Sequence, residues 1–173
     1  MRYFQQLDTP EQEIERNLRI GLQRVYSTLS AEASGTWIGQ VNYPRDAELA
    51  DILSPANEKL NWLSEEDLDY YVKFFSVGGL RGPINWYRAI PLNGPDTMEL
   101  SKKKIQQPAA FVAGEQDDVL KYAGTNNEWL IAMEEWFSDL RFKTLISGAG
   151  HWLQCEQPDA TNKEIMKFLK MVG

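Results

Sequence analysis

The sequence has one histidine, His151, and its setting is the first indication of chemistry in the chain. The residues around it, ISGAGHWLQ at positions 146–154, follow a β-branched and aromatic run that predicts a strand and precede an amphipathic run that predicts a helix. A glycine-rich loop from strand to helix lies at the ligand-binding edge of an α/β sheet, where an imidazole can act as a general base. The alternative is a surface histidine on a connecting loop.

A carboxylate beside His151 would orient its ring and stabilise the imidazolium that forms when the ring takes a proton. Three acids follow an apolar run that predicts a buried strand: Glu115, Asp117 and Asp118. If this strand and the one before His151 are parallel neighbours, an acid and the imidazole meet at one sheet edge, as the second half of a nucleophile–acid–base site. Spacing alone leaves all three acids open, because loop carboxylates also form turns and cap helices.

The second half of the chain predicts the elements that must position these groups. Strands are expected over 107–114 and 141–146, and helices over about 127–137 and 159–171. Strand, helix, strand, helix is typical of a parallel sheet joined by right-handed crossovers. The predicted fold class is therefore α/β.

The first half of the chain predicts helices and irregular segments without a strand. A long amphipathic helix is expected from Thr9, as its N-cap, to about Ala33. A second is expected from the N-cap Ser64 to the glycine pair 78–79.

The remaining stretches of the first half carry weaker signals. Residues 36–60 lack a sustained period, which leaves at most one helical turn there. Pro83 can begin a short helix that carries Trp86 and Tyr87, whereas residues 91–96 are rich in turn residues. These aromatic side chains are compatible with an aromatic-lined pocket.

Composition excludes several classes of protein. With 173 residues, 43% hydrophobic and 25% charged, the chain has the balance of one globular domain. A net charge of -7 argues against a nucleic-acid partner, and the lysine run 102–104 is interpreted as a solvated linker. The sequence has only one histidine and one cysteine, Cys155, which are too few for a structural metal site. No motif indicates a cofactor.

The same composition predicts where the protein works. No apolar run approaches the roughly 18 residues of a membrane span, and the first residues lack the apolar core of a signal peptide. A single cysteine suits a reducing compartment. We therefore expect no membrane contact and a cytoplasmic location.

Several motifs carry a family resemblance from Leu63 to Leu169 and, more loosely, from Tyr3. They are Tyr3-Phe4-Gln5, LRGPINWYR at 80–88, GEQD at 114–117 and GHWLQ at 150–154 with Glu156, Pro158 and Asn162. In these motifs the chain closely resembles the soluble-type epoxide hydrolases of the α/β-hydrolase fold superfamily. The most specific of them is Asn-Trp-Tyr-Arg at 85–88.

The resemblance implies a role for each matching residue. Tyr87 matches a lid tyrosine that donates to the epoxide oxygen, Asp117 the acid that orients the base, and His151 the base that activates water. Trp86 and Trp152 are the expected substrate-binding residues. In the family's mechanism an aspartate attacks a carbon of a small-molecule epoxide, and hydrolysis of the resulting ester releases a vicinal diol. Residues 1–93 would form a helical lid, or cap, and residues 94–173 the last βαβα part of the core.

Parts of the family pattern are missing from the sequence. The stretch Gly35–Gly39 has Trp37 where a nucleophile elbow needs its nucleophile, and His151 is followed by Trp152 instead of the glycine of the oxyanion motif. The second lid tyrosine would precede Met1. The resemblance thus predicts a fragment with a partial α/β-hydrolase fold, lacking the N-terminal core strands and inactive alone.

A sheet of two strands leaves an edge uncovered, which predicts self-association or a complementing N-terminal chain. The alternative is a non-catalytic truncated paralogue that acts as a binding or interaction module.

Overall fold

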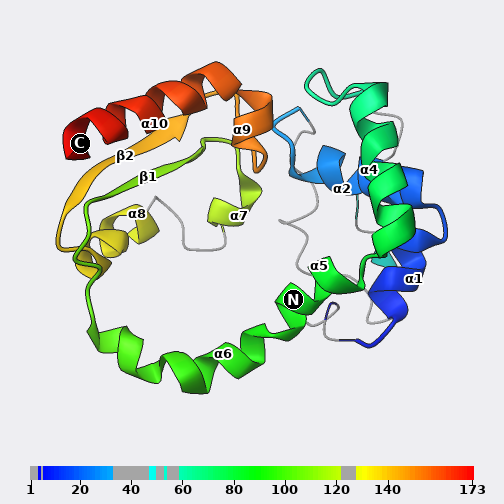
Figure 1. Ribbon diagram of the computed structural model, residues 1–173, viewed down its shortest axis with the longest axis horizontal. Helices are drawn as coiled ribbons and strands as arrows, with labels where there is room; N and C mark the ends of the chain where they lie inside the picture. Colours follow the sequence, from blue (N-terminus) through cyan, green and yellow to red (C-terminus); the bar gives the residue numbers. More distant parts are fainter. Residues whose placement is uncertain (1–3, 5, 33–46, 50–52, 54–58, 122–127) are drawn as a thin grey trace. The chain divides into compact units, whose positions relative to one another are not determined.

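The chain forms two compact units in a computed structural model, which describes residue 4 and residues 6–32, 47–49, 53, 59–121 and 128–173. The helical unit comprises Met1–Thr28 and Gly39–Met98, and the sheet unit comprises Leu29–Ile38 and Glu99–Gly173. Figure 1 shows the elements of each unit along the chain. Within the described ranges, no helix is both long and apolar enough to cross a membrane.

The helical unit contains five helices of more than one turn among its described residues. They are α1 (Thr9–Glu15), α2 (Leu18–Leu29), α4 (Glu65–Gly78), α5 (Arg81–Arg88) and α6 (Ile90–Thr97), and the 3₁₀ helix η2 (Met98–Lys102) follows. Two buried clusters hold the unit together. One gathers Ile14, Leu49, Leu80 and Ile84, and the other gathers Leu22, Leu60, Leu63 and Leu68.

The prediction of one long helix from Thr9 to Ala33 is wrong. The helix breaks between α1 and α2, where Asn17 Oδ1 accepts a hydrogen bond from the Ile20 N–H at 3.3 Å, as an N-cap does. A new N-cap inside the apolar period therefore starts a second helix. Thr9 is also not the N-cap, because Asp8 occupies that position with a φ of 65° and Thr9 is already helical.

The predicted helix after Ser64 is confirmed as α4. Ser64 Oγ accepts from the Asp67 N–H at 3.1 Å, while the Asp67 carboxylate accepts from the Ser64 N–H at 3.3 Å. Aspartate thus takes the place of the usual glutamate in a capping box. Gly79 follows the helix at a φ of 66°, which only glycine adopts easily.

The short helix around Pro83 is confirmed as α5, although it begins two residues earlier, at Arg81. The expected turns over 91–96 are wrong, because α6 covers them. Pro91 lies in the first turn of α6, where a missing N–H breaks no helical hydrogen bond. The expectation for 36–60 falls mainly outside the described residues.

The sheet unit follows the predicted order of strand, helix, strand, helix. Its elements are β1 (Ala109–Gly114), α7 (Asp118–Lys121), α8 (Glu128–Ala132), η3 (Met133–Trp136), β2 (Leu140–Ile146), α9 (Leu153–Glu156) and α10 (Pro158–Val172). The strands β1 and β2 are parallel, and their register pairs Gly114 with Ile146 at their carboxyl ends.

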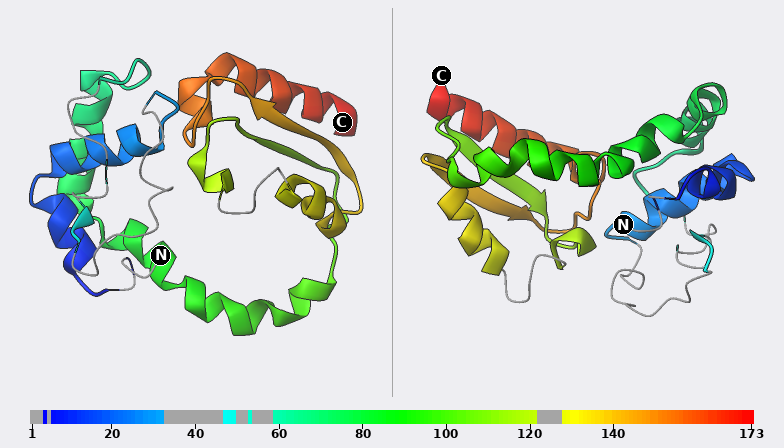
Figure 2. Two further views of the ribbon diagram at one scale, coloured as in Figure 1. Left: turned by 180° about the vertical axis from the view of Figure 1, so that it is seen from behind. Right: turned by 90° about the horizontal axis from the view of Figure 1, so that it is seen from below.

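Side chains of β2 alternate between two faces, as the strand period requires. The Phe142 ring packs edge-on against Phe168 of α10, and Thr144 Oγ1 bonds to Glu164 of the same helix. Lys143 points the other way, since its Nζ donates to the Leu130 carbonyl of α8 at 2.6 Å. Accordingly α10 covers one face of the strand pair and α8 lies toward the other (Figure 2).

Candidate active site

The parallel register brings two of the predicted site residues together. β1 and β2 end at the paired residues Gly114 and Ile146, and the loops that follow carry Asp117 and His151. His151 Nδ1 lies 3.0 Å from Asp117 Oδ2. The Asp117 side chain is 11% exposed and the His151 side chain 37%, so the acid is enclosed while the base keeps access to solvent.

Both oxygens of Asp117 have partners. Oδ1 accepts from the Val119 N–H at 2.9 Å at the start of α7, which leaves Oδ2 for His151. Glu115 is exposed, and Asp118 is the first residue of α7. Among the three acids that spacing left open, Asp117 is therefore the one bonded to the imidazole.

The hydrogen bond from Asp117 is the main cause that raises the pKa of His151 above its usual 6.5. Burial acts in the opposite direction, and the negative charges of Asp117 and Glu156 add to the increase. With Nδ1 held as the donor to Asp117, Nε2 of the neutral ring is the nitrogen that can accept a proton.

Asp117→Asn is expected to lower the pKa of His151, because the amide carries no charge to stabilise the imidazolium. In the wild type, the pair stabilises the fold fully below the unfolded histidine pKa of about 6.5 and loses this effect as pH rises through the higher folded pKa. The denaturation midpoint should therefore fall over that range, and less so in the variant.

A proton NMR titration of the single imidazole, together with denaturant midpoints against pH, measures both effects of Asp117→Asn. Asp139→Asn, just before β2 begins, is the control and should leave the titration unchanged. An imidazole that titrates identically in the wild type and in Asp117→Asn contradicts the assignment.

The His151 loop fits against β1 because Gly114 lacks a side chain. A Cβ on Gly114 would lie 2.1 Å from the Gly150 carbonyl oxygen and 2.4 Å from that of Ala149. Gly148 adopts a φ of 73°. The ladder continues past the strand ends, since the Gln116 N–H donates to the Ala149 carbonyl at 2.9 Å.

Trp152 belongs to the same site. Its ring lies edge-on to the His151 imidazole, with centroids 5.1 Å apart and an interplanar angle of 81°. The half-buried indole is thus a wall beside the candidate base.

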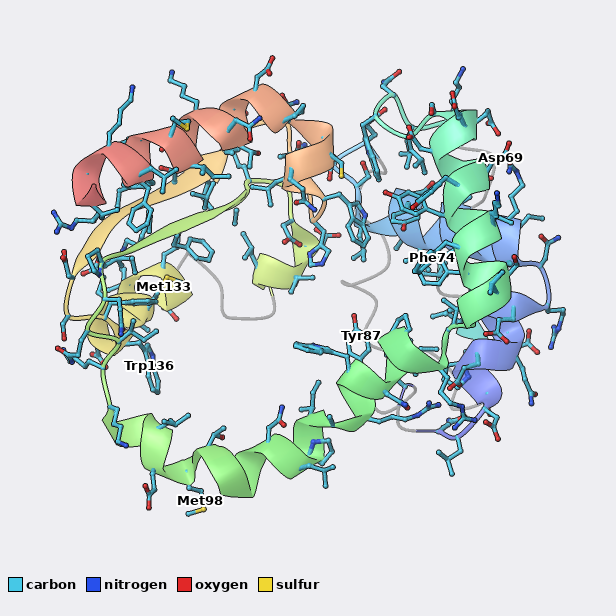
Figure 3. All side chains as sticks on the ribbon, viewed as in Figure 1. Asp69, Phe74, Tyr87, Met98, Met133 and Trp136 are labelled. Atoms are coloured by element: carbon cyan, nitrogen blue, oxygen red, sulfur yellow. The ribbon has the colours of Figure 1, made fainter. Side chains whose placement is uncertain are left out.

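Tyr87 and Trp86 lie on α5 in the helical unit, and Figure 3 shows the Tyr87 side chain projecting from that helix. The Tyr87 ring stacks on Phe4 with centroids 4.8 Å apart, and Trp86 is largely exposed. The structure thus brings His151, Asp117 and Trp152 together, while the meeting of Tyr87 with them stays a prediction.

A buried ion pair fixes α5, and sequence reasoning missed it. Arg88 Nη2 donates to Glu11 Oε2 of α1 at 2.8 Å, and the two side chains are only 12% and 7% exposed. Arg88 is the main cause that lowers the pKa of the Glu11 carboxyl. The two residues are 77 positions apart in the sequence, so no local pattern identifies them as a pair.

Within the described ranges, no group of three or more His, Cys, Asp and Glu side chains could hold a metal ion. A surface pocket of the helical unit is lined by residues between positions 13 and 24 together with Glu48, Leu49 and Leu53, and none of the predicted site residues lines it. The chemistry offered by the described residues is that of an acid-oriented base.

Two parallel strands with an acid after the first and a histidine after the second form the acid–base end of an α/β-hydrolase-type site. The comparisons with known proteins define the family further. Bifunctional epoxide hydrolase 2 of Rattus norvegicus is 31% identical over 171 residues, which cover 97% of this chain and 29% of that protein. Epoxide hydrolase A of Mycobacterium tuberculosis is 38% identical over 108 residues, 62% of this chain and 32% of that protein. No family model matches the chain.

Solved structures agree with these relatives. An epoxide hydrolase from an endophytic Streptomyces superposes with a TM-score of 0.88 at 31% identity, over 97% of this chain and 50% of that one. Epoxide hydrolase A of Mycobacterium thermoresistibile gives a TM-score of 0.85 at 28% identity, over 99% and 51%. Over nearly its whole length the chain is similar to α/β-hydrolase-fold epoxide hydrolases, and it has a partial α/β-hydrolase fold. It spans about a third of the length of these curated relatives and about half of these solved chains.

Proposed function

We propose that this chain supplies the base, the orienting acid and a lid tyrosine of a site that hydrolyses an epoxide to a vicinal diol. The observation that carries the proposal is the contact of 3.0 Å between His151 and Asp117 at the carboxyl ends of two parallel strands. The epoxide hydrolases among its relatives support the choice of substrate class.

The first proposed step forms an ester. A carboxylate attacks an epoxide carbon, the carbon–oxygen bond of the ring breaks, and the Tyr87 phenol gives its proton to the departing oxygen. The donor matters because an alkoxide is a poor leaving group unless a hydrogen bond meets its developing charge. The covalent ester divides one difficult displacement into two easier steps.

The second proposed step is hydrolysis of this ester. Nε2 of neutral His151 takes a proton from water, and the resulting hydroxide attacks the ester carbonyl. The ester bond then breaks, the diol leaves, and the carboxylate is restored. The imidazolium proton returns to the Tyr87 phenolate, which regenerates the neutral base and the phenol. Asp117 keeps the ring oriented and stabilises the imidazolium while it holds the proton. Trp86 and Trp152 are the proposed apolar walls for the substrate.

The attacking carboxylate is proposed to come from a segment outside these 173 residues. Glycines four positions apart occur at 35–39 and 78–82, and their central residues, Trp37 and Leu80, are not nucleophiles.

Residues 1–93 would then act as the lid, and residues 94–173 as part of the core. A complementing polypeptide is the proposed partner, and the cytoplasm is the proposed compartment because one cysteine suits a reducing environment.

A binding or interaction module is the second candidate function. Three large apolar side chains at helical spacing on α4, Tyr70, Phe74 and Val77, are exposed, and Val77 reaches 89%. Such a stripe is typical of a surface that another chain covers.

Complementation tests the proposal. The chain is expressed alone and together with the N-terminal half of the related Streptomyces epoxide hydrolase, and styrene oxide turnover is measured. We expect none from the chain alone and measurable diol from the pair. Tyr87→Phe should lower the rate about 100-fold, whereas Tyr70→Phe, an exposed tyrosine of α4, should not change it.

Two results contradict the proposal. Turnover by the chain alone would place a nucleophile within these residues. Halves that co-purify as a folded complex without turnover would favour the binding module.

A further inference from the structure

The carboxylate of Glu156 accepts four hydrogen bonds around the candidate base. Oε2 accepts from the Gly150 N–H at 3.1 Å, and Oε1 accepts from the Trp152 N–H at 3.0 Å. These two residues flank His151 in the sequence. One side chain therefore holds the backbone on both sides of the imidazole.

The other two donors come from the segment after α2. Ala31 donates its N–H to Oε2 at 2.8 Å, and Ser30 donates its hydroxyl to the same oxygen at 3.1 Å. The Leu29 carbonyl completes the arrangement by accepting the N–H of His151 itself at 2.9 Å. All three consecutive N–H groups of residues 150–152 are thus engaged, two by Glu156 and one by Leu29.

Close packing leaves this arrangement little freedom. A Cβ on Gly150 would lie 2.5 Å from the Ala31 nitrogen and 2.7 Å from the Leu29 carbonyl oxygen. Both atoms are backbone, so they cannot move aside as a flexible side chain could. Residues 29–31 therefore lie directly against the His151 loop.

We propose that Glu156 is a positioning residue, which together with residues 29–31 fixes the backbone of 150–152 and thereby holds the His151 ring against Asp117. We call these residues the Glu156 clamp. Hydrogen bonds to an ionised acceptor are about twice as strong as neutral ones, which gives a carboxylate an advantage over an amide here. Glu156 bonds to the backbone on both sides of His151 and takes no proton in the proposed reaction.

Two charged groups in the described part of the chain act on the imidazole, Asp117 through a hydrogen bond and Glu156 through its charge. Both stabilise the imidazolium. The uncharged Trp152 ring also packs against the imidazole, in an edge-on arrangement. Loss of the clamp should therefore weaken the bond to Asp117 and remove one negative charge, and both changes lower the pKa of His151.

Glu156→Gln in the full chain tests the clamp. Glutamine keeps the shape of the side chain, but it carries no charge and its NH₂ group cannot accept from the backbone N–H donors. The bond to Asp117 should weaken and one negative charge is lost, so we expect NMR to show a lower pKa for the His151 imidazole. Hydrogen exchange at the Gly150 and Trp152 N–H groups should accelerate at least about 10-fold, as loss of a hydrogen bond to a charged group predicts. Exchange within β1 and β2 should change little.

Glu135→Gln is the matched control, because it makes the same change at an exposed site on η3 and should leave both readouts unchanged. Glu156→Asp keeps the charge and should restore part of the protection. An unchanged imidazole titration in folded Glu156→Gln overturns the proposal.

If Glu156→Gln does not fold, Ser30→Ala carries the test, because it removes one donor to Oε2 without changing the charge. We expect faster exchange at Gly150 and Trp152 in that variant, and unchanged exchange there overturns the proposal.

The inference rests on the proposed function only for its effect on turnover. Neither the titration nor the exchange measurement involves an epoxide. These measurements can therefore contradict the role of Glu156 without contradicting the proposed function, and the turnover assay can contradict the proposed function without contradicting the role of Glu156. In the complemented enzyme, Glu156→Gln should lower kcat more than it changes KM. It should also move the ascending limb of the pH–rate profile to lower pH, because the base loses its proton at lower pH.

Discussion

Replacement of His151 by glutamine is expected to stop the proposed reaction at the covalent ester. The alkylation step needs no base, whereas hydrolysis needs water from which a proton has been removed. Turnover in the complemented enzyme should therefore fall by roughly 10³-fold or more, while about one epoxide per site is still consumed. Rapid-quench counting of product, together with the mass of the polypeptide that carries the nucleophile, measures both quantities.

Gln154→Ala is the control for this variant, because Gln154 is exposed on α9 three residues after His151. It should keep normal turnover. Repeated turnover at the wild-type rate in His151→Gln would show that His151 is not the base, even if the complemented protein is an epoxide hydrolase.

Gly114→Ala is expected to destabilise the sheet unit by about 3 kcal/mol or more, at the upper end of what overpacking causes. The added methyl would meet three backbone atoms of Ala149 and Gly150 within 2.6 Å. The His151 loop would have to leave the end of β1, which also separates the base from Asp117. Denaturant unfolding followed by tryptophan fluorescence measures the stability, and the NMR titration reports the imidazole.

Gly94→Ala is the matched control, since a Cβ at Gly94 in α6 meets no atom within 4 Å. Alanine in a helix should stabilise it by up to about 1 kcal/mol. Equal stabilities of the Gly114→Ala and Gly94→Ala variants would contradict the close approach at Gly114.

The elements that could be predicted from the sequence are those that local signals specify. The capping box of Ser64 and Asp67 lies within four residues and indicates where α4 begins. Between α1 and α2 the apolar period continues across Asn17, so that the pattern hides a break that one side-chain hydrogen bond creates. In α6 the prolines are typical of turns, although Pro91 is compatible with the first turn of a helix.

The candidate site shows the same limit. That an acid should meet His151 follows from two strands and their loops, but the choice of Asp117 depends on the path of the loop after Gly114. Residues 29–31 are covered by the predicted helix to about Ala33, and nothing in the sequence indicates their contact with the His151 loop, because these hydrogen bonds connect residues more than 100 positions apart. Periodicity describes which face a residue lies on and carries no information about a distant partner.

The place of residues 29–31 in the sheet unit has a consequence for folding. They leave the ribosome well before Glu156, with a sequence separation of 126 between Ser30 and its acceptor. Closing so long a loop is entropically unfavourable and slow, so the His151 loop should be among the last parts to become ordered. A polypeptide of residues 94–173 would retain both strands, the acid and the base, yet it would lack the donors of Ser30 and Ala31. Residues 1–93 thus contain a piece of the sheet unit, and cutting the chain at one point cannot yield both units intact.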